Sequence, residues 1–262
     1  MPFKILYTAD LHGNKEYYKK LITKAKDSEI KAVVIGGDLC PKGGPTVEDA
    51  VKAQKEFLKK FFIPELRKLK KDVFVIMGND DFRINETILE NANENLKYIN
   101  KKRFNLSSKN IVGYSFVNPT PFRLKDWEKF EDGNKETPKQ LHDYEIRTVK
   151  KEEGTIKEDL STFIKLSNPK KTIYAMHAPP FSTELDIITS GAHVGSKAIR
   201  EFIEKEQPYL ALHGHIHESP QMSGSFIGKI GKTVCINVGS SYPENKLNSI
   251  IIDTGSLDLK YT

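Results

Sequence analysis

The feature that most constrains the fold of this chain is a series of short apolar runs separated by segments with helical periodicity. Short runs rich in valine and isoleucine are typical of strands that are buried on both faces of a sheet. Between the first three runs, apolar residues recur every three or four positions, as they do in amphipathic helices. This β–α–β–α–β order predicts parallel strands covered by helices. The three runs are residues 4–9, 32–37 and 73–77.

Two further details of this pattern concern the end of one helix and the pairing of the last strands. The helix that begins near Val47 is expected to stop near Pro64, because proline has no N–H to donate and its ring clashes with the preceding turn. The last three apolar runs have no helical segment between them, so the tail is expected to form an antiparallel meander. The later predicted strands are residues 111–116, 172–176 and 209–212, followed in the tail by residues 233–238, 249–253 and 257–261.

Residues 118–166 differ from the rest of the chain. They contain three prolines, the only tryptophan (Trp127) and a dense mixture of charges. A chain of 262 residues can bury one large core, so we expect a single domain over residues 1–262, with residues 118–166 as an insertion near the active site. Two roles stay open for this insertion: a substrate lid, or a surface helix without a function.

Composition restricts the classes of protein that the chain can belong to. Hydrophobic residues make up 38% and charged residues 29%, as in a globular protein. No apolar run approaches the roughly 18 residues that span a bilayer, so no membrane partner is expected. Cys40 and Cys235 cannot build a disulfide framework, and no signal-peptide pattern precedes the first strand, so a cytoplasmic location is expected.

The formal charge of +6 comes mainly from lysines that are interspersed with glutamates. A solvated surface explains this pattern at least as well as a nucleic-acid patch does. A nucleic-acid partner is therefore allowed by the composition but is not indicated by it. The oligomeric state is left open.

Side chains of the types that bind metals follow five of the predicted strands. Because the carboxyl ends of strands in α/β sheets gather at one edge, donors from distant parts of the chain are expected to meet in one cleft. Imidazole, carboxylate and amide groups without a thiolate favour Mn, Fe, Zn or Ni over a soft metal. The expected ligands are Asp10, His12, Asp38, Asn79, His177, His215 and His217.

This donor set suits two divalent transition-metal ions that share a carboxylate. Two divalent ions carry four positive charges, of which Asp10 and Asp38 neutralise two. The remaining charge would attract a phosphate group and acidify a bridging water. His213 alternates with His215 along its strand, so we expect it to be buried and hydrogen-bonded rather than to act as a ligand.

In their order along the chain, these fragments resemble the motifs of the calcineurin-like metallophosphoesterases. The resemblance covers almost the whole chain, and the set is specific although each fragment alone is weak. The motifs are DxH at residues 10–12, GD at 37–38, GN at 78–79, His177 and GHxH at 214–217. Within that superfamily the chain is similar to the Icc-related predicted phosphoesterases of prokaryotes at residues 177–180 (HAPP), 185–186 (LD), 193–196 (HVGS) and 214–219 (GHIHES).

The resemblance implies an αββα sandwich and hydrolysis of a small-molecule phosphate ester by a hydroxide that bridges two metal ions, with manganese among the candidate metals. Two alternatives stay open: a non-catalytic metal-binding scaffold of the same fold, and a nuclease. The resemblance places Asp10, His12 and His217 on one ion, Asn79, His177 and His215 on the other, and Asp38 between them.

The chain departs from the family pattern at Asp80, where many members have a histidine that contacts the scissile phosphate or protonates the leaving group. Near two cations the pKa of Asp80 is expected to be lowered, so this candidate catalytic residue is expected to be ionised and a poor proton donor. We therefore expect a preference for phosphodiesters or activated esters. A second hypothesis is that Asp80 caps the following helix or hydrogen-bonds a metal-bound histidine.

Four residues on the rim of the predicted cleft are further candidates. His193, the second catalytic candidate, lies in a glycine-rich loop that opens a helix, where backbone N–H groups can meet an anion. A role for His193 in capping local structure is an equal alternative. The candidates for contacts with the phosphate or the leaving group are Asn14, Asn118 and Phe122.

Overall fold

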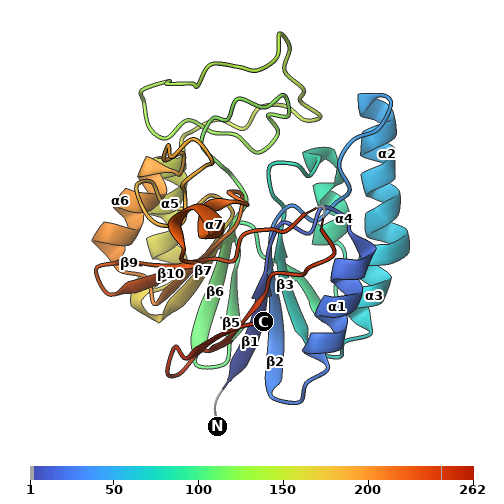
Figure 1. Cartoon of the computed structure of the whole chain (residues 1–262), viewed down its shortest axis with the longest axis vertical. Helices are drawn as coiled ribbons and strands as arrows, with labels where there is room; N and C mark the ends of the chain where they lie inside the picture. Colours follow the sequence, from blue (N-terminus) through green and yellow to red (C-terminus); the bar gives the residue numbers. More distant parts are fainter. Residues whose placement is uncertain (1–2, 243) are drawn as a thin grey trace.

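Two mixed sheets pack face to face in this protein, whose computed structural model describes residues 3–242 and 244–262. Helices cover the outer face of each sheet, as Figure 1 shows. The predicted four-layer αββα sandwich is therefore confirmed. An inner apolar cluster, which includes Val34 of one sheet and Ile173 of the other, fills the space between the sheets.

Parallel strands form the centre of both sheets, so their carboxyl ends gather at one edge. The first sheet has the order β12 (Leu259–Tyr261), β11 (Ile250–Asp253), β1 (Lys4–Thr8), β2 (Ile30–Gly36), β3 (Asp72–Ile76) and β4 (Leu96–Tyr98). The second has the order β5 (Arg103–Leu106), β6 (Lys109–Tyr114), β7 (Thr172–Met176), β8 (Leu210–His213), β10 (Thr233–Asn237) and β9 (Ile227–Ile230).

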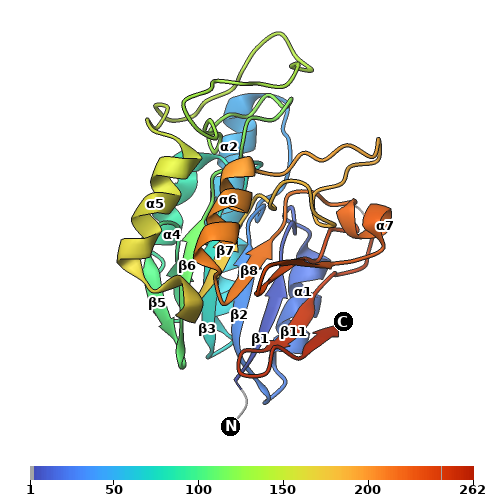
Figure 2. The same cartoon turned by 90° about the vertical axis from the view of Figure 1, so that its left-hand side faces the viewer.

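The outer layers consist of short helices. Helices α1 (Lys15–Ala25), α2 (Val47–Phe57), α3 (Ile63–Arg67) and α4 (Glu86–Glu90) cover the first sheet, whereas α5 (Ile156–Leu166) and α6 (Lys197–Glu206) cover the second (Figures 1 and 2). A further helix, α7 (Ser219–Ser223), follows β8. Among residues 3–242 and 244–262, none of the helices combines the length and the apolar character that crossing a membrane requires.

The helix that begins near Val47 does not stop near Pro64. A π-helical turn at Leu58–Phe62 joins α2 to α3, and Pro64 lies in the first turn of α3. The N–H of Ile63 donates to Leu58 O, five residues earlier, which is the spacing of a π-helix. At the start of a new helical turn the missing N–H of proline is tolerated, so the chain continues to Arg67.

The tail does not form a meander, because its strands divide between the two sheets. β10 pairs antiparallel with β9 but parallel with β8 in the second sheet. β11 pairs antiparallel with β1 in the first sheet and forms a hairpin with β12. Ile250 and Ile252 of β11 are fully buried in the cluster between the sheets. This burial favours the return of the chain to the first sheet.

Residues 118–155 form an irregular segment that lies above the carboxyl edge of the sheets in Figure 1. The remaining residues of the predicted insertion form α5, which packs beside α6 in the outer layer (Figure 2). Buried Trp127 ties the irregular segment to the main body, since its Nε1–H donates to Asp81 O at 2.8 Å.

Candidate metal centre and adjoining pocket

The first donor group consists of Asp10, His12, Asp38 and His217, whose potential ligand atoms all lie within 4.8 Å of one another. The Nε2 atoms of His12 and His217 are 3.0 Å apart. Two ring nitrogens at this distance need a proton or a cation between them, because their lone pairs would otherwise repel. Asp38 Oδ2 lies 3.8 Å from His12 Nε2, and Asp10 Oδ1 lies 3.7 Å from His217 Nε2. This set of nitrogen and carboxylate donors fits a divalent transition metal.

The second donor group is centred on Asn79. Its Oδ1 lies 2.6 Å from His215 Nδ1 and 3.0 Å from His177 Nε2. Asp38 Oδ1 lies 3.6 Å from the same nitrogen of His177. The two oxygens of Asp38 therefore face different groups: Oδ2 faces His12 and Oδ1 faces His177. Asp38 thus connects the two donor groups.

Unusual backbone conformations place four of these side chains. Asp10, His12, Asp38 and His215 have positive φ values of 58°, 42°, 50° and 68°. Such values are uncommon for residues other than glycine, and they cluster at functional sites. Backbone hydrogen bonds hold two of the turns, from Asp10 N to Gly37 O at 3.0 Å and from His12 N to Asp38 O at 2.9 Å.

Burial and mutual charges set the protonation of the donors. Burial lowers the pKa of His12 and of His215 to about 3, so both rings are neutral at pH 7. Burial also disfavours a charged His177, but the negative charge of Asp38 outweighs it and raises the pKa of His177 to about 9. Burial disfavours ionised Asp38, yet His177 and His12 hold the pKa of this carboxyl well below its usual range.

Hydrogen bonds outside the two groups orient the ligands. His177 Nδ1 lies 2.8 Å from Gly36 O, which leaves its Nε2 facing the second group. The backbone N–H of His215 donates to Asp10 Oδ1 at 3.1 Å. The backbone N–H of Asp80 donates to Asp38 Oδ1 at 2.8 Å. Ligands of both groups are thus linked by backbone donors.

Asp80 lies beside the first donor group. Its Oδ2 is 2.7 Å from Lys42 Nζ and 3.7 Å from His12 Nδ1, and its Oδ1 accepts from Asn79 Nδ2 at 3.1 Å. It does not cap the following helical turn, Arg83–Asn85, whose N-cap residue is Phe82. Among the groups of the chain, burial and the charge of Asp38 raise the pKa of Asp80, while Lys42 opposes this rise. The sequence predicted a lowered pKa for Asp80, and that lowering requires cations bound beside it.

Two residues near the centre were missed by sequence reasoning. Asp81 is fully buried and accepts hydrogen bonds from Gly78 N, Leu39 N and Cys40 N at 2.8–3.0 Å, so it joins the loops that follow β2 and β3. Its position next to Asp80 was visible, but the sequence does not say which of two adjacent carboxylates points inward. The other residue is Lys42, whose loop position carries no sequence signal.

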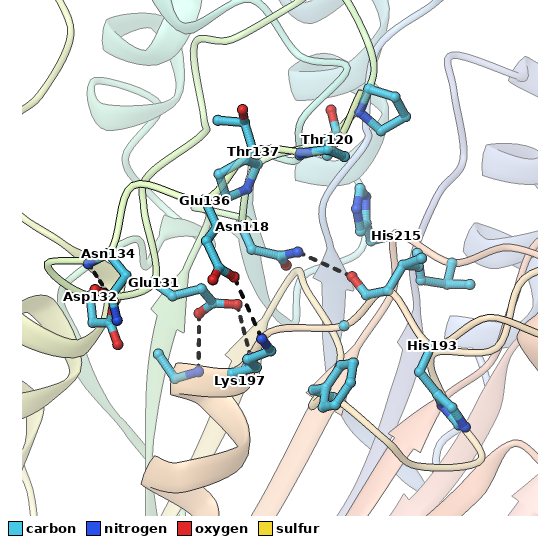
Figure 3. A pocket seen from close by; sticks show the side chains of 18 of the residues that line it. Asn118, Thr120, Glu131, Asp132, Asn134, Glu136, Thr137, His193, Lys197 and His215 are labelled. Atoms are coloured by element: carbon cyan, nitrogen blue, oxygen red, sulfur yellow. Dashed lines mark hydrogen bonds and ion pairs between the residues drawn. The ribbon is translucent and has the colours of Figure 1, made fainter. Parts of the chain in front are cut away.

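A pocket of about 610 Å³ opens beside the second donor group and has His215 in its lining. Figure 3 shows that residues of the irregular segment, including Asn118, form one side of it. Much of its wall is apolar, and Asn118 and Phe122 both line it. Asn14 has a different place: its Oδ1 caps α1 by accepting from Glu16 N and Tyr17 N.

The amino end of α6 borders this pocket but does not offer free N–H groups there. Glu131 accepts hydrogen bonds from Lys197 N at 2.8 Å and Ala198 N at 3.0 Å, as Figure 3 shows. The side chain of Ser196 accepts from Ile199 N. The expected anion contact at this helix end is therefore replaced by the carboxylate of Glu131.

His193 lines the pocket but is held by a residue of its own loop. Its Nδ1 lies 2.7 Å from Oδ1 of fully buried Asp186. Figure 3 shows the ring directed away from His215. Asn118 lines the same pocket, and its Nδ2–H donates to Val194 O at 3.1 Å. His213, as expected, is buried, and its Nδ1 lies 2.9 Å from Ala178 O.

Comparisons with known proteins identify relatives of this arrangement. Residues 3–219 match the sequence model of a family described as calcineurin-like phosphoesterase. No curated protein is significantly similar in sequence. Two crystal structures align with 100% of this chain and 99% of their own, at TM-scores of 0.70 and 0.65 and sequence identities of 16% and 15%. The second is TT1561 of Thermus thermophilus.

A further solved structure aligns less closely. It is GAP50, described as the anchor in the inner membrane complex of Plasmodium, with a TM-score of 0.54 and 11% identity over 99% of this chain and 88% of its own. At identities this low, the likeness to all three structures shows the fold alone. The family match, by contrast, covers most of the chain.

Proposed function

Because this chain belongs to the calcineurin-like phosphoesterase family, we propose that its two donor groups hold two divalent transition-metal ions and that it hydrolyses a small phosphodiester or an activated phosphate ester beside them. Membership in the family makes the chain a metal-dependent hydrolase that acts on phosphoester bonds. The number of ions, the substrate and the order of steps are our proposal.

The position of Asp38 is the observation that carries the two-ion proposal. Each of its oxygens faces a different set of donors, and each set contains one imidazole that is neutral at pH 7, His12 in the first and His215 in the second. Two bound divalent cations would acidify a water and offset the negative charge of a phosphate group. Asp38 would hold the two sites at a fixed separation, and the buried histidines would exclude bulk water from their inner side.

The pocket beside His215 supports a small organic ester as the substrate. It is large enough for the alcohol portion of such an ester, and its lining includes Phe122, Phe181 and Ile188. Several charged groups of the lining already have partners within the chain: Glu131 caps α6, and Lys157 pairs with Glu201 at 2.7 Å. An uncharged, largely apolar group therefore fits this pocket best.

The environment of Asp80 supports a preference for leaving groups that depart without a proton. Asp80 is paired with Lys42 at 2.7 Å, and a carboxylate that forms an ion pair with an ammonium group is ionised and has no proton to donate. Lys42 is a weak acid, because Asp80 stabilises its charged form. Aryl phosphodiesters should therefore be hydrolysed faster than unactivated phosphomonoesters.

The test is metal reconstitution followed by turnover of an aryl phosphodiester and a phosphomonoester with Mn, Ni, Zn and Mg. We expect close to two transition-metal ions per chain and hydrolysis that favours the diester. Asp38→Ala should lose at least one ion and reduce turnover by roughly a thousandfold or more, because a shared ligand is gone. Lack of metal after reconstitution, together with full activity of Asp38→Ala, would show that the two-ion proposal is wrong.

A scaffold role is the main alternative, since one structural neighbour is described as an anchor. Retention of both donor groups favours the enzyme, because a protein-binding surface does not require six buried or half-buried donors around one shared carboxylate. Turnover separates the two roles: a scaffold would bind metal without hydrolysing any ester.

A further inference from the structure

Lys42 lies in the loop that joins β2 to α2, four residues after Asp38. Its ammonium group is 2.7 Å from Asp80 Oδ2, and 40% of its side chain is exposed. The ammonium is therefore held in place on one side and open to solvent on the other. A half-exposed ion pair contributes little to the stability of a fold, so stability alone does not account for this placement.

The ammonium group of Lys42 lies next to the first donor group. Asp80, its partner, is 3.7 Å from Nδ1 of His12 and donates its backbone N–H to Asp38. Lys42 also lies over the ring of Tyr242, at 5.9 Å from the centroid, and that ring is 5.2 Å from the ring of His12. Through Asp80 and Tyr242, Lys42 is thus one contact away from the first donor group.

A lysine beside a cation centre is electrostatically unfavourable unless an anion accompanies it. Asp80 supplies that anion permanently, and a phosphate group would supply a second one whenever substrate is bound. A phosphate group held beside the two donor groups would keep at least one oxygen free to accept a hydrogen bond from a neighbouring side chain. Lys42 has three N–H donors, and a single contact with Asp80 leaves others free.

We propose that Lys42 contacts a non-bridging oxygen of the substrate phosphate and that Asp80 holds the ammonium group in position for this contact. The inference rests on the proposed function, because it takes the phosphate to lie beside the two donor groups. Lys42 is then a substrate-binding residue and Asp80 a positioning residue. This pair would provide charge recognition of the phosphate without a proton donor.

The first test measures binding of inorganic phosphate to metal-reconstituted protein by calorimetry, together with its metal content. Lys42→Met should weaken phosphate binding about tenfold, the usual size of one lost charge-assisted contact, and leave the metal content unchanged. Lys42→Arg, which keeps the charge, should stay within about threefold of the wild type. Equal phosphate affinity of wild type and Lys42→Met would overturn the assignment.

Lys102 provides a matched control. Its ammonium group is 2.9 Å from Glu90 Oε1 and 5.7 Å from the ring centroid of Tyr98, and 47% of its side chain is exposed. It therefore has the same kinds of partners as Lys42, but it lies between β4 and β5, away from the donor groups. Lys102→Met should leave phosphate affinity unchanged. A loss equal to that of Lys42→Met would reduce the effect to net charge and contradict the assignment.

The role of Asp80 is tested by a double-mutant cycle with Asp80→Asn. If Asp80 positions Lys42, Lys42→Met should cost clearly less phosphate affinity in the Asp80→Asn background than in the wild type. Additive effects would remove the positioning role. The test of the enzyme stays separate. If the wild type binds two ions and hydrolyses esters, but Lys42→Met binds phosphate as tightly as the wild type, only the assignment of Lys42 is refuted. A wild type that neither binds metal nor hydrolyses esters refutes both proposals.

Discussion

At the scale of single residues, His177 links the protonation of the site to metal binding. Its pKa is raised to about 9, because the charge of Asp38 outweighs the effect of burial. A cation that binds Nε2 must displace this proton, since a coordinated imidazole is neutral there. The protein thus holds a proton where a metal would be, and acid should favour the proton.

We therefore predict that metal binding at pH 7.5 releases at least one proton per chain, the one on His177. Metal affinity should fall as pH is lowered, because each displaced proton competes with the cation. Calorimetric titrations with Mn²⁺ in two buffers of different ionisation enthalpy measure the released proton. A heat of binding that is the same in both buffers would contradict the role given to His177, and His177→Asn provides the control.

Gly78 is the residue at which the site depends most directly on the lack of a side chain. A Cβ atom at this position would overlap Asp38 Oδ1 and crowd the ring of His177. We predict that Gly78→Ala lowers metal affinity at least tenfold, because the shared carboxylate must move. Gly133, whose added Cβ would meet no atom within 4 Å, gives the control. Metal titration of both variants tests this prediction. If Gly78→Ala bound metal as tightly as Gly133→Ala, Asp38 would tolerate the displacement.

At the scale of elements, a cluster of charges attaches the irregular segment to the loops that follow β3 and β4. Glu152 pairs with Arg83, Lys101 and Lys129, and Lys129 is almost fully buried. Burial opposes ionisation of Glu152, but its three cationic partners lower its pKa to about 2. Removing one partner of a buried ion pair leaves an uncompensated charge, which is costly.

We predict that Glu152→Gln lowers the free energy of unfolding by roughly 1–3 kcal/mol at pH 7. Since the folded pKa lies below the unfolded value of about 4.3, this stabilisation is present above pH 4.3 and is lost as pH falls toward 2. Urea unfolding at pH 7 and pH 3 measures it. Glu145→Gln, at an exposed carboxylate 3.8 Å from Arg147, is the control. If Glu152→Gln were as stable as Glu145→Gln, the charge cluster would not anchor the irregular segment.

Elements also mark how far sequence reasoning reaches. Strand β7 was predicted to the residue, and β1 to β3 within two residues at each end, because buried parallel strands give continuous apolar runs. The tail was wrong because an apolar run does not state which sheet it will join. The carboxylate of Glu131 at the amino end of α6 could not be predicted either, since it comes from a part of the chain 66 residues earlier.

At the scale of the whole molecule, the order of strands and helices predicted parallel strands covered by helices, and the family resemblance implied the αββα sandwich. The donors followed from their position after strands. Lys42 did not follow, because its importance comes from a partner on another loop, Asp80. The pocket did not follow either, since it needs the irregular segment and the loop around His193 to face each other. Local pattern thus predicts elements, whereas contacts between distant segments decide the surroundings of the site.

Each donor group draws on both sheets. Asp10, His12, Asp38 and Asn79 follow strands of the first sheet, and His177, His215 and His217 follow strands of the second. Neither half of the sandwich holds a complete group, so the site comes into being only when the two halves dock. A bound ion would then cross-link the two sheets, and the affinity for that ion would report how well the two halves are aligned.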